Sequence, residues 1–467
     1  MVVEKDIIVA VELGSTAIRA IAGKREPDGS MQVLAVAQEE SANAIRKGVV
    51  DNIDRTTQAI RRVVDQINEK LGVFVNSVYV GLGGQSLHAV SNKVSRQFGE
   101  KIQIAHSMVD EMKDTNLGVM YPDAEILDVV PQEFRIGNRL VADPVGMQSE
   151  QLEAHFLNVI SRKSLSENIE KCVQGAGLEM AELLISPICL SDALLSASEK
   201  RSGCALVDMG ADTTSIAVYD GGMLRHLIVI PLGGSNVTAD IMSKSIEQEE
   251  AETLKLKYGT AYRVETEDQS DEDIALSHSR NIKESVLQEI VEARYEEIID
   301  NIWEQIRGKS QLLSGVVFTG GCARVRNLTE AFTQFTHCGP LSLRVAKGLP
   351  VGISLSSGVR PDVEQLDTLM ALLLQGKCSC VTEKPEEKVV QDEINFGDET
   401  PEQPVATENE AEQNTPETPE TEKTPKKPRE GLGKKVMKWW EKINDAFSEP
   451  EDYHLSYQIN YMHYGRQ

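Results

Sequence analysis

Two segments of the chain repeat one pattern, and this repeat constrains the fold more than any other feature. The segments are IIVAVELGSTAIRAIAGKREPDGSM, which starts at Ile7, and GCALVDMGADTTSIAVYDGGML, which starts at Gly203. In each, an apolar strand ends at an acidic residue, a glycine and small polar residues follow, and a second strand leads into a glycine turn. Their separation is far longer than a solenoid repeat, so we expect two related lobes that face one another.

Strands and helices are predicted to alternate from Ile7 to Leu374, because apolar β-branched runs alternate there with helical patterns, as in α/β proteins. Gly72 and Gly175 are expected to end two of the helices. The clearest strands are predicted at residues 7–11, 78–81, 205–208 and 316–319, and the clearest helices at 56–71, 164–175 and 282–306.

The composition excludes several classes of protein. A net charge of −25 argues against nucleic-acid binding, since phosphate recognition needs clustered cations. Seven scattered cysteines do not form a disulfide framework, and Cys378 and Cys380 lack the second Cys/His pair of a zinc site. There is no signal-peptide pattern, and no apolar run approaches the roughly 18 residues of a membrane span. We therefore expect a cytoplasmic protein whose membrane contact is peripheral.

The turns of the two repeated segments are suited to phosphate. They are Glu12–Thr16 and Asp208–Thr214. Glycine lets the backbone approach a ligand, N–H groups and hydroxyls donate to phosphate oxygens, and a carboxylate at a strand end can hold Mg²⁺ through water. Ordinary glycine hairpins are the alternative, and the pairing of two such turns disfavours it.

Two further glycine motifs follow predicted strands. Gly320 and Gly321 end a strand in GVVFTGGCARVRNL, where backbone can pack flat against a base or sugar. Gly233 and Gly234 have the turn-then-helix form that suits a phosphate, although a single diglycine turn is weak evidence.

The last part of the chain differs in character. Residues 377–430 are rich in Glu, Pro, Thr and Gln and predict a disordered acidic linker. Residues 431–448 predict an amphipathic helix that lies on anionic lipid, and residues 449–467 form a tail. The alternative is that this helix packs back on the body. The predicted membrane contacts are Leu432, Lys434, Lys435, Val436, Lys438, Trp439, Trp440, Ile443 and Phe447.

Together with EAETLKLKYG from Glu250 and GLEMAELLISP from Gly177, these motifs resemble the actin, Hsp70 and sugar-kinase ATPase superfamily and, within it, the FtsA family of bacterial cell-division proteins. The resemblance implies a bilobed actin-like ATPase fold with an inserted subdomain, followed by the linker and the amphipathic helix. The implied parts are a first lobe core at 1–83 and 163–200, the insert at 84–162, a second lobe core at 201–240 and 310–376, and a small subdomain at 241–309.

The resemblance also implies ATP and Mg²⁺ as ligands. Glu12 stands where the superfamily usually has Asp, and its extra methylene moves the carboxylate about 1.5 Å. We therefore expect tight ATP binding with weak or absent hydrolysis, and no catalytic residue is assigned. The implied metal carboxylates are Asp208 and Glu12, and the implied ATP contacts are Gly14, Ser15, Thr16, Gly210, Asp212, Thr213, Thr214, Gly233, Gly234, Glu252, Lys255, Gly320 and Gly321.

By the same resemblance, the chain would anchor filaments of the tubulin-like protein FtsZ to the cytoplasmic face of the cell membrane at the division site and help to assemble the divisome. The implied partners are the FtsZ C-terminal peptide, further copies of the chain in filaments, anionic lipids and later division proteins. Arg294 and Tyr295 are the implied peptide contacts. A small-metabolite kinase and a chaperone-like ATPase of the same superfamily are the alternatives.

Overall fold

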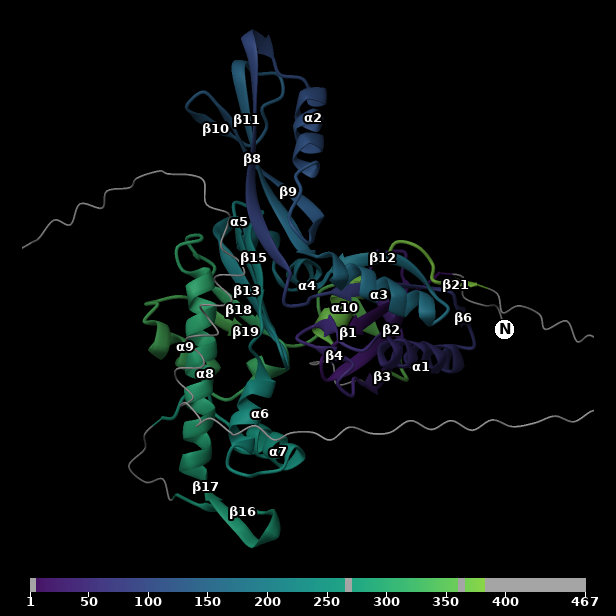
Figure 1. Cartoon of the computed structure of the whole chain (residues 1–467), viewed down its shortest axis with the longest axis vertical. Coiled ribbons are helices and arrows are strands. Elements are labelled where there is room, and N and C mark those ends of the chain that lie inside the picture. Colours follow the sequence, from purple (N-terminus) through teal and green to yellow (C-terminus); the bar gives the residue numbers. More distant parts are fainter. Residues whose placement is uncertain (1–5, 265–270, 360–365, 383–467) are drawn as a thin grey trace, which may run out of the picture. The chain divides into compact units, whose positions relative to one another are not determined.

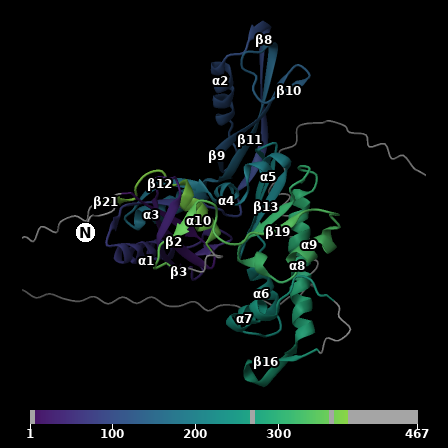
Figure 2. The same cartoon turned by 180° about the vertical axis from the view of Figure 1, so that it is seen from behind.

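The computed structural model describes residues 6–264, 271–359 and 366–382. Two large sheets with helices packed against them form this part of the chain (Figures 1 and 2). Each repeated segment contributes a strand pair to a different sheet, the first to a six-stranded sheet and the second to a nine-stranded sheet. The α/β fold with two lobes that the repeat predicts is therefore confirmed.

The six-stranded sheet forms the first lobe. Its strands β1 (Ile7–Leu13), β2 (Ala17–Arg25) and β3 (Met31–Glu40) are antiparallel neighbours joined by short turns. By contrast, β7 (Ser77–Leu82) and β20 (Ile353–Leu355) run parallel to the strands that they pair with. A parallel neighbour requires a long crossover, and the helix α1 lies in the connection to β7. In spatial order the strands are β12 (Glu179–Ile185), β7 (Ser77–Leu82), β1 (Ile7–Leu13), β2 (Ala17–Arg25), β3 (Met31–Glu40) and β20 (Ile353–Leu355).

The helices of the first lobe follow from local sequence signals. In α1, the Asn52 side chain accepts from the Arg55 N–H at the start, and Gly72 adopts the left-handed conformation at the end. The helix predicted at residues 164–175 ends at Gly175 as expected, and the positive φ that follows it belongs to Gly177. The helices are α1 (Ile53–Leu71), α3 (Lys163–Gly175), α4 (Ser186–Leu194), α5 (Ala197–Ser202) and α10 (Asp367–Gln375).

The nine-stranded sheet extends from the second lobe into the inserted segment. The strands β8 and β15 join the two parts through the pairing of His88 with Ile228. In spatial order the strands are β10 (Arg139–Val141), β9 (Ala124–Ile136), β11 (Gln148–Arg162), β8 (His88–Gln103), β15 (Met223–Ile230), β14 (Thr214–Asp220), β13 (Cys204–Met209), β18 (Val316–Thr319) and β19 (Leu343–Val345).

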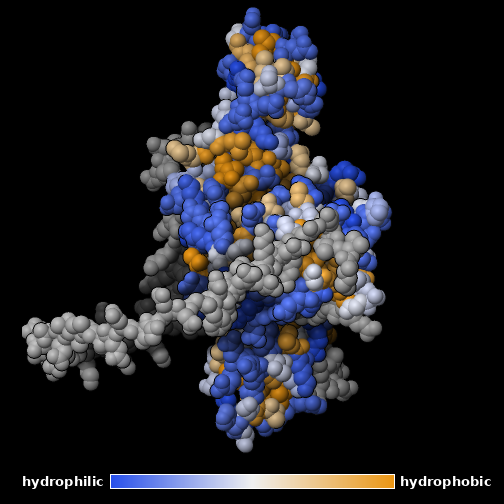
Figure 3. All heavy atoms as spheres, turned by 90° about the vertical axis from the view of Figure 1, so that its right-hand side faces the viewer, coloured by the Kyte–Doolittle hydropathy of each residue, from blue (hydrophilic) through white to orange (hydrophobic). Residues whose placement is uncertain are grey.

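The inserted segment has its own small core. Phe134 and Phe156 are buried there with Met112 of α2 (His106–Leu117). The insert is also tied to the second lobe by the guanidinium of Arg225, which donates to both carboxylate oxygens of Glu133 at 2.9 and 2.5 Å. On the face seen in Figure 3, hydrophobic side chains gather just below the insert, while much of the remaining surface is hydrophilic.

The helices of the second lobe pack around α8, whose buried residues recur at helical spacing. The helix predicted from residue 282 begins at Glu284, because residues 280–283 form a strand of a small hairpin. The helices are α6 (Gly234–Met242), α7 (Gln248–Tyr258), α8 (Glu284–Ile306) and α9 (Leu328–Thr336). The hairpin strands are β16 (Asp273–Leu276) and β17 (Arg280–Lys283).

The segment after α10 stays on the first lobe. The strand β21 (Val381–Thr382) pairs with β6 (Phe74–Val75), and the hydroxyl of Tyr79 accepts the N–H groups of Lys377 and Cys378 at 2.9 Å each. The linker predicted from residue 377 therefore cannot begin before Thr382. No helix among the described residues is long and apolar enough to cross a membrane.

Candidate functional site

The turns of the two repeated segments have the same backbone geometry. The Gly14 N–H donates to the Ala17 carbonyl at 3.1 Å, and the Gly210 N–H donates to the Thr213 carbonyl at 2.8 Å. A Cβ at Gly14 would lie 2.7 Å from the Ala17 oxygen, and one at Gly210 would lie 3.0 Å from the Thr213 oxygen. Both tight turns therefore favour glycine, which explains the repeated sequence pattern.

Three carboxylates gather beside these turns. Glu12 and Asp208 stand two residues before the two turn glycines, and Asp367 at the first position of α10 raises the pKa of both. The Asp367 carboxylate accepts the Thr319 hydroxyl at 2.6 Å. Oε2 of Glu12 is buried without a hydrogen-bond partner, and the nearest guanidinium nitrogen of Arg19 lies 3.8 Å away. An unpaired buried oxygen of this kind is costly unless a ligand satisfies it.

Burial and neighbouring charges favour the protonated forms of Asp208 and Glu12. Burial, then the charge of Glu12, then that of Asp367 raise the pKa of Asp208 to about 7. Burial is also the main cause of the raised pKa of Glu12, and Arg19 opposes it. Sequence reasoning missed Asp367, although an Asp that opens the apolar helix DTLMALLLQ is a recognisable helix start.

The other glycine motifs bring backbone close to the second turn. A Cβ at Gly233 would lie 2.5 Å from the Ala211 oxygen, so the start of α6 packs directly on the turn. Gly320 has φ +90°, and a Cβ there would lie 2.5 Å from Oδ1 of Asp208. At Gly321, by contrast, a Cβ would meet no atom within 4 Å, so this backbone faces open space.

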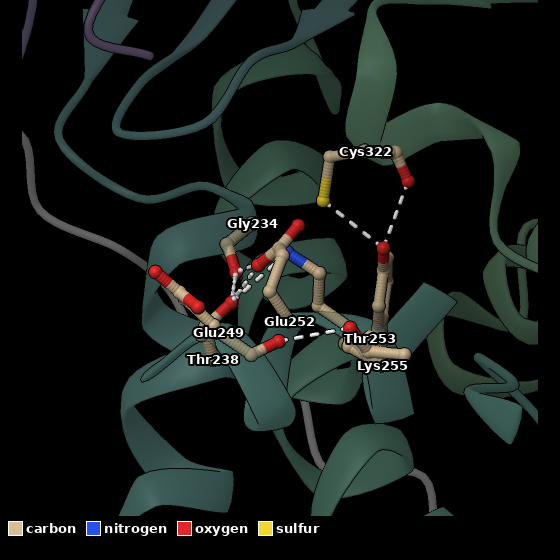
Figure 4. Close-up of polar contacts among 8 residues, drawn as sticks. Gly234, Thr238, Glu249, Glu252, Thr253, Lys255 and Cys322 are labelled. Atoms are coloured by element: carbon tan, nitrogen blue, oxygen red, sulfur yellow. Dashed lines mark hydrogen bonds and ion pairs between the residues drawn. The ribbon is translucent and has the colours of Figure 1, made fainter. Parts of the chain in front are cut away.

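Polar side chains of α7 form another wall of the site (Figure 4). The Lys255 ammonium donates to Glu252 at 2.7 Å, to the Thr238 hydroxyl at 3.0 Å and to the Gly234 carbonyl at 3.2 Å. The Thr238 hydroxyl in turn donates to Glu252 at 2.6 Å. These contacts hold Lys255 and Glu252 against the start of α6, and Figure 4 shows the four groups converging.

The two residues predicted to bind a partner peptide occupy different surroundings. Tyr295 is only 3% exposed, and its hydroxyl donates to the Cys322 carbonyl at 2.8 Å. It therefore supports the wall of the site instead of standing on the surface. Arg294 is partly exposed and donates to Asp240 at 2.5 and 2.9 Å, and it also pairs with Glu297. A partner contact at Arg294 stays a prediction.

The elements described above enclose a cavity of about 520 Å³ that both lobes line. Two of the residues predicted to bind ATP or Mg²⁺ lie outside its lining. Thr214 is buried and donates its hydroxyl to the Leu232 carbonyl at 2.8 Å, and Gly233 supports the second turn from behind. The predicted residues in the lining are Glu12, Gly14, Ser15, Thr16, Asp208, Gly210, Asp212, Thr213, Gly234, Glu252, Lys255, Gly320 and Gly321.

A metal could be held here only with help from its ligand. Among the described residues, no group of three or more His, Cys, Asp or Glu side chains is placed to bind a metal ion by itself. Mg²⁺ usually keeps several waters and binds through one or two carboxylates and substrate phosphates. Glu12, with its unpaired oxygen, and Asp208 fit that mode.

The predicted membrane contacts between Leu432 and Phe447 lie outside the described residues.

Comparison with known proteins shows the family. The family model for cell division protein FtsA matches residues 205–361, and the model for the SHS2 domain inserted in FtsA matches residues 84–160. The cell division protein FtsA of Porphyromonas gingivalis is 31% identical over 348 residues, which cover 70% of each chain. That of Bacillus subtilis is 31% identical over 331 residues, which cover 68% of this chain and 74% of the relative.

A solved structure has a similar fold. The PilM–PilN type IV pilus biogenesis complex contains a chain that matches with a TM-score of 0.54 and 14% sequence identity, over 79% of this chain and 97% of that one. At this identity the likeness concerns the fold alone. The sequence relatives and the inserted SHS2 domain settle the family: the chain belongs to the FtsA family of cell-division proteins.

Proposed function

We propose that the chain binds ATP with Mg²⁺ in the cavity between its lobes. The observation that supports this proposal best is the pair of matching glycine turns at one cavity, Glu12–Thr16 and Asp208–Thr213. Each turn presents small polar side chains and backbone to the same space, as phosphate sites do. The cavity of about 520 Å³ also falls within the range of roughly 300–1,000 Å³ that is typical of small-molecule sites.

Different residues of the cavity would contact different parts of ATP. Ser15, Thr16 and Thr213 would donate to phosphate oxygens, and the open backbone at Gly321 leaves room for a flat base or sugar. Lys255 supplies a cation whose position is fixed by its three oxygen partners. When bound, Mg²⁺ would neutralise phosphate charge, and Glu12 and Asp208 would hold its water shell.

We propose that hydrolysis is slow. A general base for water must be unprotonated and free to accept a proton. Burial favours the protonated carboxyl of Asp208, and this group and Glu12 are also the ones that would orient the metal. ATP would then serve mainly to set the conformation of the body.

The nucleotide proposal has a matched test in two adjacent threonines. Thr213 lines the cavity, whereas the hydroxyl of Thr214 is committed to a backbone carbonyl. Thr213→Val in the full chain should weaken binding of a fluorescent ATP analogue with Mg²⁺ about tenfold, the value of one hydrogen bond to a charged group. Thr214→Val should lower the unfolding temperature and leave nucleotide affinity unchanged. Equal affinities for Thr213→Val and the unchanged chain would count against the site.

We further propose that the chain anchors FtsZ filaments to the cytoplasmic face of the cell membrane, with self-association, the FtsZ C-terminal peptide and later division proteins as its contacts. Family membership supports this role over a small-metabolite kinase or a chaperone. The basic, tryptophan-bearing segment at residues 431–448 supports peripheral binding to anionic lipid. One short helix binds weakly, so linked copies would hold a membrane better than single ones.

Membrane binding is tested separately with vesicles. The full chain should float with vesicles that contain anionic lipid, and a truncation ending at Lys423 should not. Trp439→Glu combined with Trp440→Glu should reproduce the loss without shortening the chain, because it places charge on the predicted apolar face. If the truncation floats as well as the full chain, the tether does not reside in this segment.

A further inference from the structure

The turn between β4 (Ile45–Arg46) and β5 (Val49–Val50) lies between the two phosphate-type turns. The Lys47 N–H donates to Oδ2 of Asp212 at 3.1 Å, which connects it to the second turn. The Gly48 N–H points at the Ser15 hydroxyl oxygen, 3.4 Å away, which connects it to the first. The β4–β5 turn is thus a bridge, made of two consecutive N–H groups, between the lobes.

The opposite side of the β4–β5 turn contacts the start of the inserted segment. The Gln85 N–H donates to the Lys47 carbonyl at 3.1 Å. A Cβ at Gly48 would lie 2.8 Å from both the Gly83 oxygen and the Gly84 Cα, and a Cβ at Gly84 would lie 2.7 Å from the Gly48 oxygen. The two backbones therefore touch directly, without flexible side chains between them.

This contact leads into the insert within a few residues. The Leu87 N–H donates to the Gly84 carbonyl at 3.0 Å, and the strand β8 begins at His88. Leu165, just after the insert ends, also lies close, because a Cβ at Gly84 would be 3.0 Å from its Cδ1. Both ends of the insert are therefore in reach of the same backbone contact.

We propose that the β4–β5 turn couples the nucleotide cavity to the inserted subdomain, a proposal that rests on the function proposed above. Phosphate placed between Ser15 and Asp212 changes the positions of the two groups to which Lys47 and Gly48 are bonded. Because close-packed backbone transmits displacement instead of absorbing it, the turn then moves the base of the insert. Gly84 acts as a positioning residue in this coupling.

Hydrogen–deuterium exchange of the full chain tests the coupling. With saturating ATP and Mg²⁺, or with the imido analogue of ATP, amides at the base of the insert, residues 85–92 and 157–165, should exchange at least about threefold more slowly. Amides at the far end, residues 98–103 and 136–148, should change less. An insert whose base exchanges equally with and without bound nucleotide would overturn the proposal.

The substitution Gly84→Ala separates the coupling from nucleotide binding. Gly84 does not line the cavity, and its φ is not positive, so the added methyl acts through its clash with Gly48. At saturating ATP and Mg²⁺ we expect Gly84→Ala to bind the nucleotide and to lose the nucleotide-dependent protection. The matched control is Gly358→Ala, where a Cβ would meet no atom within 4 Å, and it should respond like the unchanged chain.

The outcomes distinguish the two proposals. If the unchanged chain does not bind ATP, the proposed function itself fails. If it binds ATP and Gly84→Ala retains the full protection, the coupling through this contact is wrong and the proposed function stands. Should Gly84→Ala fail to fold, the exchange measured on the unchanged chain still decides, since it requires no variant.

Discussion

Replacing Asp208 by Asn should remove the loss of stability that the ligand-free chain suffers when Asp208 ionises at raised pH. Burial and the neighbouring Glu12 and Asp367 raise the pKa of Asp208 from 3.8 to about 7. Between these two values the folded state holds a proton that the unfolded state releases. The contribution of Asp208 is therefore fully present below about pH 4 and is lost as the pH rises through 7.

The size of this effect follows from the shift in the pKa. One pKa unit corresponds to about 1.4 kcal/mol, so a rise from 3.8 to about 7 amounts to at most about 4 kcal/mol of folding free energy. Because Asp208 interacts with two other carboxylates, part of this free energy belongs to the titration of Glu12 and Asp367 and not to Asp208 alone. Only the part of the shift between pH 5 and about pH 7 is titrated when the pH rises from 5 to 8.5, so a difference of about 1–3 kcal/mol between these two pH values is the expected result.

Urea unfolding at several pH values, without nucleotide or divalent cations, measures this difference. Asp208→Asn should be more stable than the unchanged chain at pH 8.5 and about equally stable at pH 5. Asp110→Asn, which removes the same charge from an exposed position of α2, is the control and should keep the pH dependence of the unchanged chain. Parallel stability curves for the Asp208→Asn variant and the unchanged chain would refute the argument that Asp208 is buried beside like charges.

Three further results are expected. Affinity for ATP with Mg²⁺ should rise about tenfold from pH 6 to pH 8, because the metal must displace the proton from Asp208. The Asp208→Asn variant keeps the titration of ATP itself and should therefore show a smaller rise. Isothermal titration calorimetry at both pH values measures the two affinities. Gly210→Ala should weaken ATP binding at least about tenfold and lower stability by about 1–3 kcal/mol, since its Cβ meets the Thr213 carbonyl, and an unchanged affinity would contradict the tight turn. Lys255→Met should lower the free energy of unfolding in urea by about 1–3 kcal/mol and weaken ATP binding, because it leaves Glu252 without its cation. Unchanged stability and affinity would contradict the role proposed for the polar side chains of α7.

The parts of the site that the sequence predicts are those with local causes. A tight turn that favours glycine has a recognisable sequence pattern, and Gly14 and Gly210 could be identified because this pattern occurs twice. The strand at residues 316–319 was predicted from its apolar run, and the end of α1 was predicted from Gly72. Short-range sterics and apolar periodicity are readable without knowledge of the fold.

The parts that sequence reasoning missed depend on contacts between distant segments. Asp367 reaches the cavity only because α10 packs into the first lobe, and Gly48 matters because of its contact with Gly84. Thr213 belongs to the turn and lines the cavity, whereas Thr214 is the first residue of β14 and its hydroxyl donates to the distant Leu232 carbonyl. Tyr295 was predicted to contact a partner peptide, but its ring belongs to the buried stripe of α8.

The return of the chain to the first lobe determines where mechanical load acts. A force applied to the residues beyond Thr382 acts first on the two-residue strand β21 and on the two hydrogen bonds to the Tyr79 hydroxyl. These few hydrogen bonds would break before the core of the lobe is disturbed. Behind them lies α10, and Arg25 donates to the carbonyl of Leu374 in its last turn at 2.9 Å and to that of Gly376 just after it at 2.7 Å. The other end of this helix is Asp367 in the cavity, so tension applied beyond Thr382 and occupancy of the cavity act on opposite ends of one buried helix.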